Sequence, residues 1–151
     1  AKECHRGELT HRLWHSELGQ NILKQCPSLK AVNDPAWPGF CRVILNRHAT
    51  EMTDLPIEDR SALMKAVCVV ESALRSLMQP TKINLASFGN VVPHLHWHII
   101  PRWQDDRNFP EPIWGLVQRE STTARPEISN HRITAALDAA LADLPYPPGA
   151  S

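Results

Sequence analysis

The most regular pattern of apolar and polar positions in the chain lies between residues 53 and 80. Leucine and valine side chains recur there at the alternating spacings of one helix face, at Leu63, Val67, Val70, Leu74 and Leu77. Asp54 can cap the helix, Pro56 suits its first turn, and two acidic residues follow where the helix dipole favours negative charge. Pro80 ends the pattern, so we expect a helix of about 20 residues.

Three shorter segments have the composition of β-strands. Residues 41–48 (CRVILNRH) are rich in branched apolar side chains, residues 82–89 (KINLASFG) follow the helix, and residues 94–103 (HLHWHIIPRW) alternate histidines with large apolar residues. Only the turn at residues 89–93 (GNVVP) separates the last two segments, so we expect them to be antiparallel neighbours.

Loops and a second helix complete the pattern. Residues 31–40 contain two prolines and a glycine and are expected to form a loop, as is the segment that follows Trp103. A second helix is expected at residues 130–143, and a short helix or strand around Leu13–Leu23. Strands on both sides of a long helix, two of them in a hairpin, predict an α+β domain built on an antiparallel sheet.

Length and charge restrict the class of protein. The 151 residues suit one domain, which we divide into an N-terminal extension (1–30), a core (31–103) and a C-terminal loop and helix (104–151). Sixteen acidic residues balance sixteen basic ones, so no excess charge favours binding to nucleic acid or to a membrane. No apolar run is long enough to span a membrane.

The N-terminal segment and the cysteines predict a cytoplasmic protein. Residues 1–20 lack the basic-then-apolar order of a secretory signal. The four cysteines form no close pair in the sequence, as expected of reduced thiols: Cys4, Cys26, Cys41 and Cys68. A zinc site made of cysteines is not indicated either, because its ligands usually come in close pairs.

Three of the eight histidines stand at every second position of the segment HLHWHII, residues 94–100. On a strand such residues share one face, so His94, His96 and His98 are expected to form a row with a spacing of roughly 6–7 Å. The residues between them would point into a core against the long helix: Leu95, Trp97 and Ile99.

Three functions are compatible with such a row. The first is a solvated polar face, although Thr, Ser, Lys or Glu are more usual there. The second is a metal site, because two histidines at i and i+2 of a strand can chelate zinc, and His48 could add a ligand. The third is catalysis on phosphate, because a neutral imidazole is a good nucleophile near pH 7. The turn containing Gly89 would then offer backbone N–H donors to a phosphoryl oxygen.

The same seven residues resemble the His-φ-His-φ-His-φ-φ signature of the histidine triad (HIT) superfamily, in which φ is an apolar residue. The preceding NDPAWPGFCRVILNRH, the long helix and the KINLASFGN segment follow in that family's order, so the resemblance covers residues 31–103. The segment DDRNFPEPIWG is similar to bacterial members. The resemblance implies a HIT-like α+β fold, with a five-stranded antiparallel sheet and two helices, usually paired as a homodimer.

The resemblance also implies an activity. Members of the family are nucleotide hydrolases or nucleotidyl transferases that act at the α-phosphate. The middle histidine, His96, would attack phosphorus and form a nucleotidyl-histidine intermediate, which water or another acceptor resolves. His98 would lie near the leaving group as a proton donor, and His94 would orient His96 through its backbone carbonyl. Neither a metal nor another cofactor would be required.

Several positions depart from the family's pattern or are candidates for substrate contacts. Phe40 stands where many members have a histidine after glycine, and Asn90 stands where many have glutamine. The Asn90 amide could still contact a phosphate. Asn84 is a candidate for contact with sugar or phosphate, and Asn33 or Asp34 with a ribose hydroxyl, with capping of turns and strands as the alternative role.

Two basic residues near the row are secondary candidates for the site. His48 could partly replace the missing histidine of the family, although it aligns with a different position. Arg102 is expected to be an exposed charge at the end of the triad strand, from where it could attract phosphate.

We therefore predict a hydrolase of the histidine triad type, similar to a purine nucleoside phosphoramidase, that binds a nucleotide or nucleoside phosphoramidate. The alternatives are a dinucleotide polyphosphate hydrolase, a nucleotide-binding module with vestigial activity, and a zinc-binding protein.

Overall fold

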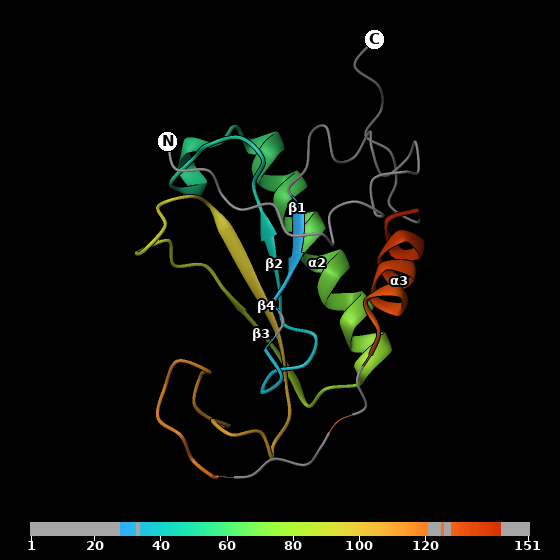
Figure 1. Cartoon of the computed structure of the whole chain (residues 1–151). Coiled ribbons are helices and arrows are strands. Elements are labelled where there is room, and N and C mark those ends of the chain that lie inside the picture. Colours follow the sequence, from blue (N-terminus) through green and yellow to red (C-terminus); the bar gives the residue numbers. More distant parts are fainter. Residues whose placement is uncertain (1–27, 33, 121–124, 126–127, 143–151) are drawn as a thin grey trace.

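The computed structural model describes residues 28–32, 34–120, 125 and 128–142 (Figure 1). The elements in chain order are β1 (Ser28–Ala31), β2 (Cys41–Ile44), the short 3-10 helix η2 (Met52–Asp54), α2 (Ile57–Met78), β3 (Lys82–Ala86), β4 (His96–Arg102) and α3 (Asn130–Ala142). The α+β class and the two helices are thus confirmed. None of the helices described is long and apolar enough to cross a membrane. The element expected around Leu13–Leu23 lies outside the described residues.

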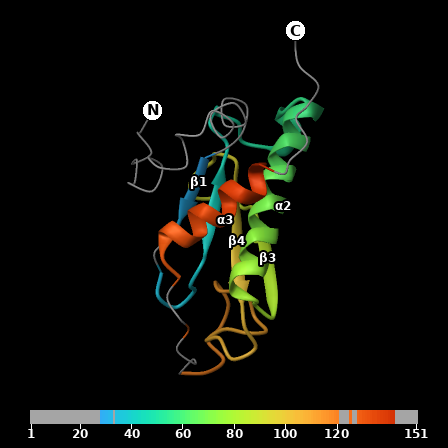
Figure 2. The same ribbon diagram turned by 90° about the vertical axis from the view of Figure 1, so that its right-hand side faces the viewer.

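The strands form one antiparallel sheet in the order β1-β2-β4-β3. Helices α2 and α3 lie on the same face of this sheet (Figure 2). β3 and β4 are hydrogen-bonded neighbours, as the short turn between them predicts. The part of the chain that the structure describes contains four of the five strands expected, so the fifth stays a prediction.

The hairpin strands are shorter than predicted. β3 ends at Ala86 rather than at residue 89, and β4 begins at His96 rather than at residue 94. Gly89 has a φ of 75°, in the left-handed region that favours glycine, and Pro93 has no N–H to donate to a neighbouring strand. The hairpin therefore opens around these two residues.

β2 also ends early, at Ile44 rather than at residue 48. The chain beyond it stays beside the segment that leads into β4. The N–H of Leu45 donates to the carbonyl of Leu95 (3.1 Å), and the N–H of Leu95 donates to the carbonyl of Ala49 (2.8 Å). These bonds bring residues 45–49 next to the histidine segment.

Helix α2 has clear start and end signals. Two acidic residues occupy its first turn, as predicted, whereas Pro56 is the N-cap rather than part of the first turn. At its end Gln79 takes a left-handed conformation (φ 48°), and its N–H donates to the carbonyl of Arg75 (3.0 Å). The prediction that Asp54 caps this helix is wrong. Asp54 lies in η2, where its carboxylate accepts a hydrogen bond from the N–H of Glu51 (3.0 Å).

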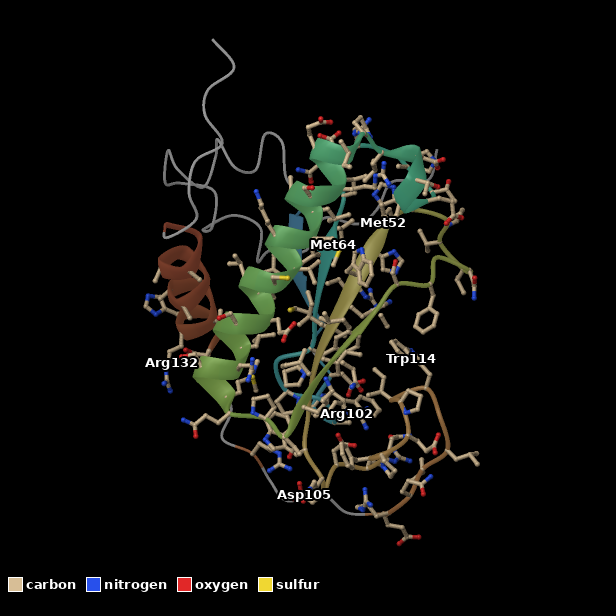
Figure 3. All side chains as sticks on the ribbon, turned by 180° about the vertical axis from the view of Figure 1, so that it is seen from behind. Met52, Met64, Arg102, Asp105, Trp114 and Arg132 are labelled. Atoms are coloured by element: carbon tan, nitrogen blue, oxygen red, sulfur yellow. The ribbon has the colours of Figure 1, made fainter. Side chains whose placement is uncertain are left out.

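The loop that follows β4 is organised around a buried ion pair, at the end of the sheet away from η2 (Figure 3). Arg102 donates to the Asp106 carboxylate from Nε (2.6 Å) and Nη2 (2.9 Å), and to the carbonyl of Glu111 (2.8 Å). Asp106 also accepts from the N–H groups of Asn108 and Phe109. We call this pair the Arg102–Asp106 hub.

The expectation that Arg102 is an exposed charge is wrong, because only 1% of it is exposed. The loop supplies the acceptors that a buried guanidinium needs. Burial by itself raises the pKa of the Asp106 carboxyl, but the hydrogen bonds and the charge of Arg102 hold that pKa below its usual value.

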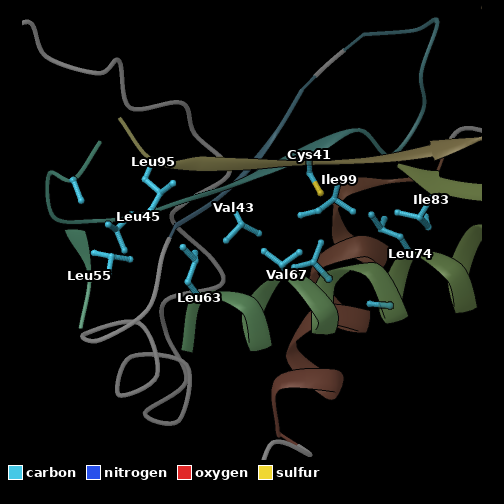
Figure 4. Packing of buried hydrophobic residues seen from close by; sticks show 13 residues of the cluster. Cys41, Val43, Leu45, Leu55, Leu63, Val67, Leu74, Ile83, Leu95 and Ile99 are labelled. Atoms are coloured by element: carbon cyan, nitrogen blue, oxygen red, sulfur yellow. The ribbon is translucent and has the colours of Figure 1, made fainter. Parts of the chain in front are cut away.

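The hydrophobic core lies between α2 and the sheet (Figure 4). It takes alternate residues of the strands and one face of the helix, as the two periods in the sequence predict. Its members include Cys41, Val43, Leu45, Leu63, Val67, Val70, Leu74, Ile83, Leu95 and Ile99. The residues between these core positions on β2 and β4 face the other side of the sheet.

Gly39 lets the loop between β1 and β2 pass close to the end of α2. Its φ of 79° is left-handed, and a Cβ at this position would overlap the sulfur of Met78. The loop closes with a hydrogen bond from the N–H of Val32 to the carbonyl of Phe40 (2.8 Å). This path fixes the position of Phe40, which is buried.

Candidate active site

The histidine row occupies the sheet face opposite the core. In the antiparallel register Ile44 lies across from His96, and Arg42 lies across from His98. Paired residues in an antiparallel sheet point to the same face, so all four side chains belong to one surface. The prediction that His94 belongs to the regular strand is wrong, because β4 begins at His96.

His96 is held by a short hydrogen bond to the main chain. Its Nδ1 lies 2.6 Å from the carbonyl oxygen of His94. A carbonyl can only accept, so Nδ1 carries the hydrogen and Nε2 of the neutral ring carries a lone pair. The carbonyl of His96 itself accepts from the hydroxyl of Ser87 (2.7 Å), which fixes the backbone at the start of β4.

His94 is oriented by the same kind of bond. Its Nε2 lies 2.6 Å from the carbonyl oxygen of Leu45 and must donate to it. Its Nδ1 lies 3.2 Å from Nδ1 of His48, and the two rings stack with centroids 5.4 Å apart. In a neutral His94 this Nδ1 accepts, so His48 donates. The structure thus brings His48 to the site as a neighbour of His94.

Within the described residues, no group of three or more His, Cys, Asp or Glu side chains is arranged to hold a metal ion.

His98 is surrounded by rings and is 6% exposed. The ring centroid of His96 lies 4.9 Å from its own, that of Trp114 5.2 Å, that of Phe40 5.6 Å and that of Phe88 6.1 Å. Its Nδ1 is buried and has no hydrogen-bond partner in the part of the chain that the structure describes. Burial, followed by the charges of neighbouring His96 and Arg42, lowers the pKa of His98 from 6.5 to about 4. The ring is therefore neutral near pH 7.

Phe40 contributes to this environment directly. Its ring contacts His98, at the position where the resemblance to the HIT superfamily implies a histidine. An apolar ring here offers no hydrogen bond to His98. His48 does not take over that position, because its described ring contact is with His94.

Arg42 was not recognised from the sequence as part of the site. It alternates with the core residues Cys41 and Val43, which places it on the opposite face of β2, but only the strand register brings it next to His98. Its guanidinium carbon lies 5.8 Å from the centroid of the Phe40 ring, and its buried Nε has no hydrogen-bond partner among the described residues. A positive charge thus faces the histidine row.

Two residues predicted to contact phosphate lie in the hairpin of β3 and β4, with Asn84 paired to Ile100 of β4. Asn84, on β3, is partly buried, and its Oδ1 accepts from Nη1 of Arg102 (2.7 Å). A phosphate oxygen only accepts, so a contact with Asn84 would use Nδ2. Asn90 is exposed in the turn next to Gly89. This placement agrees with either a phosphate contact or a role in the turn.

The two residues predicted to contact ribose lie in the loop before β2. The carboxylate of Asp34 accepts a hydrogen bond from the N–H of Ala36 (3.0 Å), so one of its oxygens caps the turn. Asn33 lies outside the described residues.

Together these groups suit a displacement at phosphorus. They provide one imidazole with an oriented lone pair on His96, a positive charge on Arg42, and a neutral imidazole on His98.

The chain is similar in sequence to known proteins over part of its length. The chain is 33% identical to AP-4-A phosphorylase of Mycobacterium tuberculosis over 87 residues. This match covers 54% of this chain and 45% of that protein. It is 25% identical over 100 residues to the nitrilase and fragile histidine triad fusion protein NitFhit of Drosophila melanogaster, covering 63% of this chain and 22% of that one. The chain therefore spans less than half the length of these curated relatives.

Solved structures extend the likeness over more of the chain. A histidine triad protein from Marinobacter aquaeolei VT8 is 27% identical with a TM-score of 0.63, covering 90% of this chain and 91% of that one. One from Bradyrhizobium japonicum is 28% identical with a TM-score of 0.63, covering 77% and 84%. The family model described as HIT domain matches residues 24–105, which is more than half of the sequence. The chain belongs to the HIT domain family.

Proposed function

We infer that the chain transfers a nucleotidyl group through His96. The observation that carries this is the hydrogen bond from Nδ1 of His96 to the carbonyl of His94, because it leaves the lone pair on Nε2. The bond from Nε2 to the α-phosphorus forms while the bond from that phosphorus to the leaving group breaks, and the electron pair departs with the leaving group. Water or another acceptor then attacks phosphorus and releases His96.

The surrounding groups support a phosphate at this position. Arg42 supplies positive charge, the turn at Gly89 and Asn90 supplies backbone donors, and Nδ2 of Asn84 supplies one more. Asp34, or Asn33 beside it, holds a ribose hydroxyl in this proposal.

The neutral state of His98 favours a phosphoanhydride over a phosphoramidate substrate. A departing phosphate is a stable anion, whereas a departing amine must acquire a proton. His98, with a pKa of about 4, holds no additional proton at neutral pH. The 33% sequence identity with AP-4-A phosphorylase over 87 residues supports the same choice. A dinucleotide polyphosphate is therefore our first candidate, and a nucleoside phosphoramidate our second.

The proposal includes a homodimer, as the family resemblance implies, and the cytoplasmic location that the sequence predicts. Light scattering on the purified chain tests the oligomeric state.

Replacement of the nucleophile tests the chemistry. We expect His96→Asn to lose on the order of 10³-fold or more in turnover of a diadenosine polyphosphate, while AMP still binds. Brief reaction with a radiolabelled substrate, followed by denaturation, should label the wild-type chain at His96 only. His131→Ala, on the exposed surface of α3, is the matched control and should keep full activity. Substantial turnover by His96→Asn would rule out the covalent route.

Product analysis identifies the acceptor. If water is the acceptor, AMP accumulates whether or not inorganic phosphate is present. If phosphate is the acceptor, ADP replaces AMP as phosphate is added.

Treatment with a chelator tests whether a metal is required. A small phosphoramidate substrate should be turned over equally well after this treatment. Loss of that activity, restored by zinc, would support the zinc site that the sequence left open.

A further inference from the structure

Two large aromatic rings beside His98 are exposed to solvent. Phe88, in the turn between β3 and β4, is 58% exposed, and Trp114, in the loop after β4, is 51% exposed. Their ring centroids lie 4.9 Å apart in an edge-to-face arrangement, and each ring also contacts His98. Rings of this size are usually buried, so an exposed pair next to a reactive site indicates a surface that receives a ligand.

Trp114 is held in place by the loop that carries it (Figure 3). The next residue, Gly115, donates from its N–H to the carbonyl of Pro112 (2.8 Å) and accepts at its own carbonyl from Nδ2 of Asn108 (3.0 Å). Asn108 is buried, and its N–H donates to Asp106 of the Arg102–Asp106 hub (3.0 Å).

Hydrogen bonds thus connect the buried Arg102–Asp106 hub through Asn108 to the residue next to Trp114 and fix this loop. The ring of Trp114 is therefore ordered before any ligand arrives, and the entropic cost of binding against it is small.

We propose that Phe88 and Trp114 form a stacking site for the nucleobase on the departing half of the substrate. The proposal rests on the proposed function, in which His98 lies beside the leaving group. Both rings contact His98, whereas His94 and His48 stack together at the opposite end of the row. A base carried by the leaving group would thus meet an aromatic surface once its phosphate reaches His96. Aromatic side chains stack on any nucleobase, because every base has a π-face.

The test compares two ligands that differ only in the second base. Both are methylene-bridged diphosphates with one adenosine arm. The second arm is adenosine in one ligand and ribose without a base in the other, so their charges are equal and neither can be cleaved at the bridge. Binding is measured by calorimetry. We expect the wild-type chain to bind the ligand with two bases more tightly. We also expect Trp114→Ala to weaken that ligand by about 5- to 100-fold while leaving the ribose ligand unchanged.

Matched variants distinguish the loss of base stacking from a general disruption of the loop. Trp114→Phe keeps a ring and should recover most of the affinity, and Phe88→Ala should repeat the loss selectively. Leu116→Ala removes an 80% exposed apolar side chain from the same loop and should change neither ligand.

Three results would overturn the proposal. If the variant loses affinity equally for both ligands, the rings contact the adenosine arm that the two ligands share, on the half that stays bound to His96. Unchanged affinity would remove the rings from the binding site. A change of oligomeric state in Trp114→Ala, seen by light scattering, would assign them to self-association. Selective loss of affinity in a chain without any turnover would keep the stacking site but reject the proposed function, so the two failures are distinguishable.

Discussion

Arg42 and His98 are partners across the β2–β4 ladder, with both side chains on the face that carries the triad. Paired residues in an antiparallel sheet have Cβ atoms about 4.5–5.5 Å apart, so the guanidinium charge acts directly on the imidazole. Besides burial and the charge of His96, this charge disfavours protonation of His98, and in the proposed function it also attracts the anionic substrate.

Arg42→Gln should therefore lower the affinity for AMP and raise the pKa of His98. Affinity for AMP should fall by about 10- to 100-fold, the usual effect of losing a charged hydrogen-bond donor. The pKa of His98 should rise, because a repelling charge is gone. Calorimetry measures the first and NMR titration of the imidazole the second. Arg75→Gln, in the exposed last turn of α2, is the control and should alter neither. Unchanged AMP affinity in Arg42→Gln would remove Arg42 from the phosphate site.

The depressed pKa of His98 predicts a pH dependence of stability. Between about 4 and 6.5 the unfolded chain holds a proton on this residue and the folded chain does not. Proton uptake then favours unfolding, so the contribution of His98 is fully present above pH 6.5 and is lost as the pH falls to about 4. Urea unfolding of the wild type and of His98→Asn across this window should show a steeper slope for the wild type. Parallel slopes would contradict a buried neutral His98.

Two of the three ion pairs among the residues that the structure describes provide a matched comparison of buried and exposed charges. Arg102→Met should destabilise the fold by about 3–5 kcal/mol, because it leaves the Asp106 carboxylate buried without its partner. Arg47→Met breaks the exposed pair with Asp59 and should cost less than about 1 kcal/mol. Urea unfolding measures both variants. Similar small losses would show that the hub does not fix its loop.

Gly39 has a left-handed backbone conformation in which an alanine would be strained. Gly39→Ala should destabilise the chain by more than the roughly 1–2 kcal/mol of a left-handed alanine, because the new Cβ also meets Met78. Adding Met78→Ala should relieve the clash but not the backbone cost. A double-mutant cycle therefore separates the two contributions. Additive effects of the two changes would mean that the side chain of Met78 does not limit this position.

The elements that the sequence predicted well are those set by local patterns. The period of the leucines and valines located α2, and the alternation in HLHWHII located the face of β4. The segment from Gly89 to Pro93 located the reversal between β3 and β4. In each case the signal lies within a few neighbouring residues, where backbone geometry dictates which side chains share a face.

The parts that were missed depend on contacts between distant segments. Arg102 has the same local pattern whether exposed or buried, and its partners come from the loop of residues 103–120 and from Asn84 on β3. Arg42 joins the site because of the β2–β4 register. Trp114 stands in a loop without periodicity, and the hub rather than any local preference brings it to His98.

The two carbonyl groups that orient His94 and His96 belong to the main chain, at Leu45 and at His94 itself. No side-chain replacement can delete them. An alanine at position 94 would remove an imidazole and still present the oxygen that sets the tautomer of His96. The orientation of the reactive ring is thus a property of the backbone path, inherited with the fold. Side chains around the ring can therefore be replaced while these two main-chain oxygens stay in place.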